Sequence, residues 1–161
     1  MPHPKPSFQT MWQHFISIYG NGNILSVGMK IGGKVQENIE LGAKDPKAGF
    51  TNACAIRMSY SLNKSGVGIP RGPWKTVSGG DKKQYIYRVS DLIKFLNQTF
   101  DQPDKTVKNP QPSDFSGMMG ILVFGVQWSD ATGHATLWDG SICSDHCHFP
   151  VASEASIWLL K

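Results

Sequence analysis

Three side chains in this sequence could together perform acyl transfer: the thiol of Cys54, the imidazole of His134 and the carboxylate of Asp145. A thiolate attacks carbonyl carbon, histidine is the usual general base, and a carboxylate commonly orients the imidazole. Each residue alone has a simpler interpretation, because a free cysteine often packs as a small hydrophobe and an aspartate often caps a turn. Their combination predicts a nucleophile, a base and an orienting residue.

The nucleophile must be placed by a helix. Thr51 or Asn52 can cap a helix whose body is AIRMSYSLN and which ends near Gly66, so Cys54 falls in the first turn. Unpaired backbone N–H groups and the positive end of the helix dipole favour a thiolate at that position.

A hairpin should bring the other two residues together. Asp139-Gly140 is a strong signal for a two-residue type I′ turn between strands near 133–138 and 141–145. That turn would pair Trp138 with Ser141, Thr136 with Cys143 and His134 with Asp145. Directly opposed residues have Cβ atoms about 4.5–5.5 Å apart, so the turn predicts a His–Asp pair that leaves the second ring nitrogen for the nucleophile.

The remaining pattern predicts helices first and strands later. Ser7 can cap a helix over residues 8–19 that Gly20 ends, and Ser90 can cap another that ends before Pro103. The other expected elements are a short distorted helix within 21–50 followed by the loop LGAKDPKAGF, a long loop at 67–80, a strand at 85–89, a polar segment at 101–117, and strands near 120–126 and 156–160. This order predicts an α+β fold, with the early helices packed on an antiparallel meander.

Length and charge exclude several classes. The 161 residues suit one domain spanning 1–161, and the net charge of +4 is dispersed, so we expect no nucleic-acid binding. The N-terminus lacks the apolar core of a signal peptide, and no apolar run is long enough to cross a bilayer. We therefore expect a protein made without a signal peptide and with no membrane insertion.

Cys143 and Cys147 are separated by three residues, and His146 and His148 flank Cys147. The group could hold a metal, form a local disulfide or remain as two reduced thiols. Zinc sites usually draw on two distant pairs, and the distant candidates Cys54 and His134 already belong to the first constellation. A disulfide is therefore favoured over a metal, and no cofactor is expected.

The chain resembles the type VI secretion peptidoglycan amidase effectors of family four, in the NlpC/P60 branch of papain-like folds. The resemblance rests on four motifs: FTNACAIRMSYSLN, YIYRVSDLIKFL, GMMGILVFGVQWSDATGHATLWDG and SICSDHC. It implies that Cys54, His134 and Asp145 are catalytic, and that the bond cut is the amide between γ-D-glutamate and meso-diaminopimelate in peptidoglycan peptide stems. It also implies delivery by the type VI secretion apparatus into the periplasm of a Gram-negative target cell, a Cys143–Cys147 disulfide and a cognate immunity protein.

Two alternatives stay open at this point. The same three residues could serve a papain-like amidase of other specificity, or a transferase that passes the acyl group to an amine. From a different class, a non-enzymatic module could bind a metal through Cys143, His146, Cys147 and His148.

Overall fold

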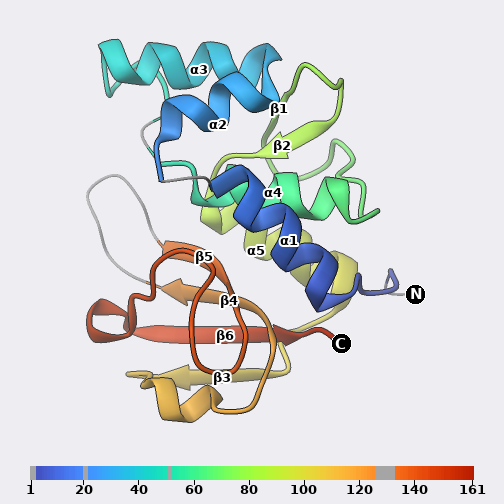
Figure 1. Ribbon diagram of the computed structural model, residues 1–161, viewed down its shortest axis with the longest axis vertical. Coiled ribbons are helices and arrows are strands. Elements are labelled where there is room, and N and C mark those ends of the chain that lie inside the picture. Colours follow the sequence, from blue (N-terminus) through green and yellow to red (C-terminus); the bar gives the residue numbers. More distant parts are fainter. Residues whose placement is uncertain (1–2, 20–21, 51, 126–132) are drawn as a thin grey trace.

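The computed structural model describes residues 3–19, 22–50, 52–125 and 133–161. Figure 1 shows the order of the elements along the chain. They are α1 (Phe8–Tyr19), α2 (Ile24–Ile31), α3 (Gly33–Lys44), α4 (Cys54–Lys64), β1 (Thr76–Ser78), β2 (Gln84–Ile86), α5 (Val89–Phe100), β3 (Lys105–Lys108), the 3-10 helix η1 (Pro112–Phe115), β4 (Gly120–Gly125), β5 (Gly133–Trp138), the 3-10 helix η2 (Phe149–Val151) and β6 (Glu154–Leu159).

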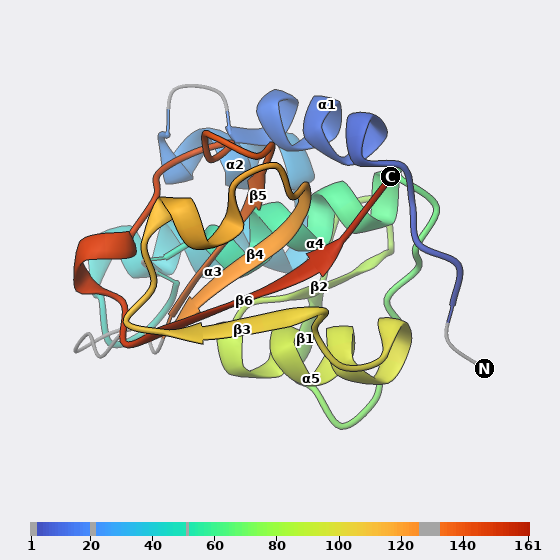
Figure 2. The ribbon, with the colours of Figure 1, turned by 90° about the horizontal axis from the view of Figure 1, so that it is seen from below.

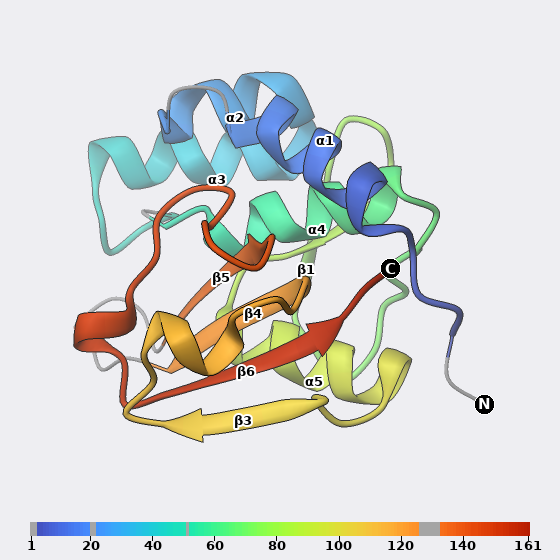
Figure 3. The same ribbon diagram turned by 60° about the horizontal axis from the view of Figure 1, so that its bottom comes forward.

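The fold is α+β, as predicted, and is built around a four-stranded antiparallel sheet in the order β3-β6-β4-β5. Helices α1, α4 and α5 cover one face of this sheet (Figure 2), and α2, α3 and the β1–β2 hairpin lie beyond α4 (Figure 3). The other face is closed by aromatic side chains of η1 and η2, among them Phe115 and Phe149. No helix among the described residues is long and apolar enough to cross a membrane.

Helix α4 is the centre of the molecule, and Cys54 to Asn63 are all buried. Its polar side chains find partners, as buried polar groups must. Ser59 Oγ donates to Ile86 O and accepts from Ile86 N, Ser61 Oγ donates to Met11 O at 2.6 Å, and Asn63 Nδ2 donates to Gln84 O at 2.9 Å. These bonds fix α4 against α1 and β2, and thereby fix the residue at its N-terminus.

Several predicted elements are confirmed. Helix α1 has the predicted bounds, and Ser7 Oγ accepts from Thr10 N at 3.1 Å. Strand β5 also has the predicted bounds, while Gly20 and Val126 lie outside the described residues. Helix α1 was identified by its helical periodicity, and β5 by its position directly before the Asp139-Gly140 turn.

Other predictions were wrong. The region 21–50 forms two helices, separated at Gly32, and α3 extends into the expected loop as far as Lys44. Helix α5 begins at Val89, so Ser90 lies inside it and is not its cap, and the expected strand at 85–89 is shortened to end at Ile86.

Two short strands were missed. Within the expected loop 67–80, residues 76–78 form β1, and within the polar segment 101–117, residues 105–108 form β3. Both are three or four residues long and too short for a reliable alternation. The sheet is also not a meander, because β6 lies between β3 and β4.

Candidate active site

Cys54 is the first residue of α4, within the first turn that the sequence predicted, and is 2% exposed. The predicted cap was wrong, because the residue at the cap position is Ala53 and not Thr51 or Asn52. Asn52 Oδ1 accepts a hydrogen bond from Cys54 N at 2.9 Å, which satisfies one of the unpaired donors of the helix start. The Cys54 thiol lies 4.0 Å from the carbonyl oxygen of Gly133, where β5 begins. The N-terminus of α4 therefore contacts β5, the edge strand of the sheet, through Cys54, the candidate nucleophile.

His134 is the second residue of β5, and it forms the predicted pair with Asp145. Its Nε2 lies 3.2 Å from Asp145 Oδ1, to which it is hydrogen-bonded, and 3.0 Å from Asp145 Oδ2. Cys54 interacts with the same imidazole and acts to raise its pKa. Since the carboxylate occupies Nε2, Nδ1 is the ring nitrogen left for the thiol. The three predicted residues thus meet in one place.

The hairpin that makes this pair differs from the predicted one. Asp139 N donates to Ile142 O at 3.1 Å, so the turn is centred on Gly140 and Ser141 rather than on Asp139 and Gly140. The Asp139 carboxylate also accepts from Ile142 N at 2.7 Å and from Ser141 N at 2.9 Å, which stabilises the displaced turn. The expected strand 141–145 is wrong, because only an isolated bridge between Trp138 and Cys143 forms.

The pairing is consequently displaced by two residues. Ser144 N donates to Leu137 O at 2.8 Å, and Asp145 therefore lies opposite Thr136 instead of His134. Side chains alternate between the two faces of a strand, so a displacement of two leaves Asp145 on the face that carries His134. The two side chains meet as diagonal neighbours, within the reach of a carboxylate and an imidazole.

Two further residues hold the acid, and sequence reasoning missed both. Thr136 Oγ1 donates to Asp145 Oδ1 at 2.5 Å. Ser144 Oγ lies 3.1 Å from Thr136 Oγ1 and accepts from Leu137 N at 3.0 Å. Thr136 is fully buried, and a polar residue on the same strand face as His134 was the signal that could have identified it.

The electrostatics of the pair favour an imidazolium beside a carboxylate. Burial lowers the pKa of His134, but hydrogen bonds with Asp145 and Cys54 more than offset this and raise it to about 9. Burial raises the pKa of Asp145, and the hydrogen bond and charge of His134 bring it below its ordinary value. His148, whose ring centroid lies 4.3 Å from that of His134, has a pKa lowered by burial and by the charge of His134. The proton therefore resides on His134 near neutral pH.

This pair should make stability depend on pH. The folded pKa of His134, about 9, exceeds the ordinary value of 6.5, so its stabilisation is complete below pH 6.5 and is lost as the pH rises through 9. We expect the free energy of unfolding in urea to fall over this window by up to about 3 kcal/mol more than in Asp145→Asn. Parallel pH profiles for the two proteins would contradict this coupling.

The Cys143–Cys147 disulfide is present, with the two Cα atoms 5.5 Å apart, and Asp145 is the central residue of the loop that it closes. Both sulfurs are therefore oxidised to a disulfide and are not available as thiolate ligands for the metal site considered as an alternative. Among the described residues, no group of three or more His, Cys, Asp and Glu side chains is arranged to hold a metal ion.

Loss of this disulfide should have a modest effect on stability. Closing a loop of about five residues removes little chain entropy, so Cys143→Ser with Cys147→Ser should lower the free energy of unfolding by about 2 kcal/mol. Urea denaturation measures the change, and intact mass after alkylation counts the free thiols. Three alkylated thiols in the oxidised wild-type protein would contradict the bond.

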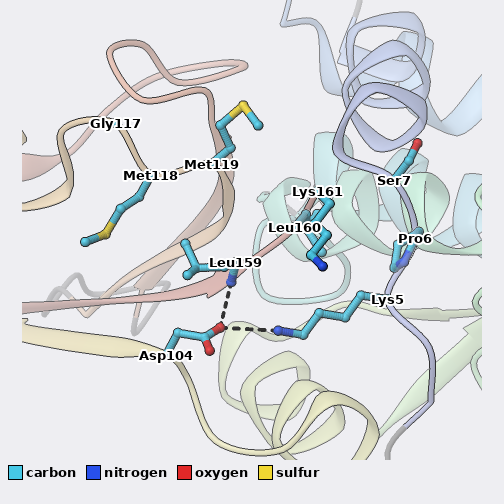
Figure 4. A pocket seen from close by; sticks show the side chains of 10 residues that line it. All are labelled: Lys5, Pro6, Ser7, Asp104, Gly117, Met118, Met119, Leu159, Leu160 and Lys161. Carbon is cyan, nitrogen blue, oxygen red and sulfur yellow. Dashed lines mark hydrogen bonds and ion pairs between the residues drawn. The ribbon is translucent and has the colours of Figure 1, made fainter.

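A separate cavity of about 870 Å³ lies at the other end of the sheet (Figure 4). It contains Met119 and Lys161, and an ion pair of 3.2 Å between Lys5 and Asp104. Leu159, which also lines it, pairs with Gly120, whereas His134 pairs with Phe124 four residues further along β4. None of the three candidate catalytic residues lines this cavity.

Comparison with known proteins points to one family. The family described as "Type VI secretion system (T6SS), amidase effector protein 4" (Tae4) matches residues 50–159. The chain is similar to Tae4 from Salmonella typhimurium, solved in complex with the immunity protein Tai4 from Enterobacter cloacae, at 46% identity over 98% of this chain and 100% of that chain, with a TM-score of 0.88. It is also similar to Tae4 from Enterobacter cloacae, at 45% identity over 100% of both chains, with a TM-score of 0.88. Among curated proteins, none matches the chain.

Proposed function

Because the chain belongs to the Tae4 family of type VI secretion amidase effectors, we propose that it is a cysteine hydrolase that cleaves peptidoglycan. The observation that carries the proposal is the meeting of the Cys54 thiol, the His134 imidazole and the Asp145 carboxylate at the junction of α4 and β5. We assign Cys54 as the nucleophile, His134 as the proton carrier and Asp145 as its orienting partner. We propose that this site is papain-like and of the NlpC/P60 type.

The proposed reaction has two steps. The Cys54 thiolate attacks the carbonyl carbon of the amide, and His134 gives its proton to the departing amine, which leaves a thioester on Cys54. Water then attacks the thioester and His134 takes a proton from this water, so that the acid product and the Cys54 thiolate separate and the initial thiolate–imidazolium pair is restored. The high pKa of His134 supports the first step, because the imidazole already holds the proton that the amine requires.

The oxyanion of this reaction needs hydrogen-bond donors. The backbone N–H of Cys54 is one candidate at the helix start, but in the structure it donates to Asn52 Oδ1 at 2.9 Å. It can serve the oxyanion only when Asn52 releases it. Asn52 thus belongs to the site as the current partner of that donor.

We further propose that the substrate bond joins γ-D-glutamate to meso-diaminopimelate in the peptide stems of a Gram-negative target, reached in its periplasm through the type VI secretion apparatus. Relatives of this chain were solved in complexes with Tai4 immunity proteins. We therefore propose that a cognate immunity protein of this kind binds and inhibits the chain.

Product analysis tests the reaction and its bond together. Purified Gram-negative sacculi are incubated with the protein, and the released fragments are identified by mass spectrometry. We expect fragments with a new free amine on diaminopimelate and a new terminal glutamate. Products in which the glutamyl group is joined to an added amine would favour a transferase, and cleavage at another amide would contradict the assigned bond.

A further inference from the structure

A second connection joins the helix of the nucleophile to the loop of the acid, in addition to the contact of His134 with Asp145. It starts at Arg57, which lies three residues after Cys54 on α4 and is only 8% exposed. Its guanidinium carbon lies 5.0 Å from the ring centroid of Tyr19, the last residue of α1, and its Nη2 donates to Gly22 O at 3.2 Å. Arg57 therefore fixes the end of α1 beside the nucleophile.

Tyr19 continues the connection to the disulfide loop. Its hydroxyl lies 3.0 Å from Nε2 of His146, and the two rings meet edge to face with centroids 6.1 Å apart. His146 directly follows Asp145, and the His146 backbone acts to lower the pKa of the Asp145 carboxyl. A single residue thus separates the hydroxyl of Tyr19 from the acid.

The cost of burying Arg57 indicates that this connection does more than fill space. Burial lowers the pKa of Arg57, while the charges of Asp145 and Tyr19 act to raise it. Its Nε is buried and forms no hydrogen bond with any described residue. An apolar side chain of similar volume generally stabilises such a position as well or better. A buried guanidinium that costs desolvation free energy beside the site therefore indicates a role in function.

We propose that Tyr19 is a positioning residue for catalysis, which holds the Asp145 loop in register with Cys54 through His146 while Arg57 holds Tyr19. This inference rests on the proposed function, because it concerns the alignment of the same three side chains. Helix α4 and the loop after β5 are far apart in sequence, so only tertiary contacts such as these can hold them in register. The connection would keep the acid from moving away from an imidazole that must shuttle a proton.

The test removes one hydroxyl. Tyr19→Phe retains the ring under Arg57 and loses only the contact with Nε2 of His146. We expect kcat for peptidoglycan cleavage to fall about fivefold with KM unchanged, the effect of losing one hydrogen bond of ordinary strength. The rate of Cys54 alkylation by iodoacetamide at pH 7 should fall in parallel, while the midpoint of thermal unfolding stays within about 2 °C. Tyr60→Phe, which removes the hydroxyl of a tyrosine on α4 outside the site, should change none of these values.

A double-mutant cycle distinguishes positioning from a general structural effect. If Tyr19 acts through Asp145, Tyr19→Phe should change the alkylation rate less than twofold when Asp145 is already alanine. An equal loss in both backgrounds, or no loss in the wild-type background, would overturn the proposal. His146→Ala provides a second cycle with the same expectation should Asp145→Ala fail to fold. Alkylation requires no substrate, so these outcomes are independent of whether peptidoglycan is cleaved.

Discussion

Replacement of Cys54 by alanine is expected to lower the rate of peptidoglycan cleavage by at least about a thousandfold, the usual consequence of removing the nucleophile from such a site. No other free thiol exists among the described residues, since Cys143 and Cys147 are joined. Muropeptide release from purified sacculi, measured by chromatography, gives the rate. The variant should fold normally, because the change removes only one small buried side chain.

Cys54→Ser is the matched variant for this measurement. It keeps a hydrogen-bonding group of similar size at the start of α4 but replaces the thiolate by a weakly nucleophilic hydroxyl. Both variants should show the circular dichroism spectrum of the wild-type protein. Cleavage by the alanine variant at more than a few per cent of the wild-type rate would end the assignment of Cys54 as nucleophile.

His134→Asn is expected to have an effect of similar size, because one imidazole both supports the thiolate and protonates the departing amine. Asparagine has no group that titrates near neutral pH, so both steps would lose their proton carrier. The alkylation of Cys54 by iodoacetamide at pH 7 should also slow markedly, and this measurement separates the loss of thiolate reactivity from a loss of substrate binding.

His14→Asn controls for the substitution itself, since His14 lies on α1 outside the constellation. It should leave cleavage and alkylation unchanged. If His134→Asn retained normal alkylation but lost cleavage, His134 would act only on the leaving group. If it retained both activities, the assignment of His134 would be wrong.

The sequence predicted the members of the site better than the geometry that joins them. The position of Cys54 in the first turn of a helix was predicted correctly, although the cap is Ala53 and not Thr51 or Asn52. The bounds of α1 follow from its helical periodicity, and those of β5 from its position directly before the Asp139-Gly140 sequence. The turn after β5 was predicted one residue too early, because the Asp139 side chain accepts hydrogen bonds from the backbone N–H groups of Ser141 and Ile142 and stabilises a turn centred on Gly140 and Ser141. The His134–Asp145 pair nevertheless forms, because the actual pairing differs from the predicted one by two residues, and a displacement of two leaves Asp145 on the strand face that carries His134.

Other features could not be read from local patterns at all. The short strand β3 exists because β6, near the end of the chain, pairs with it. Strand β1 pairs with the nearby β2, but its three residues are too few to show an alternation in the sequence. The contact of Tyr19 with His146 spans 127 residues, and no spacing rule identifies it. Tertiary packing determines these features, which is why they appear only in the folded chain.

The two-residue displacement of the hairpin also limits how the turn after β5 can change length. An insertion of one residue between Asp139 and Ile142 would rotate the following segment by one side-chain position and direct the Asp145 carboxylate away from the imidazole. An insertion of two residues would restore its direction. The disulfide would not correct an odd insertion, since both of its cysteines follow the turn. Variants of this turn should therefore retain an assembled site when the number of inserted residues is even and lose it when that number is odd.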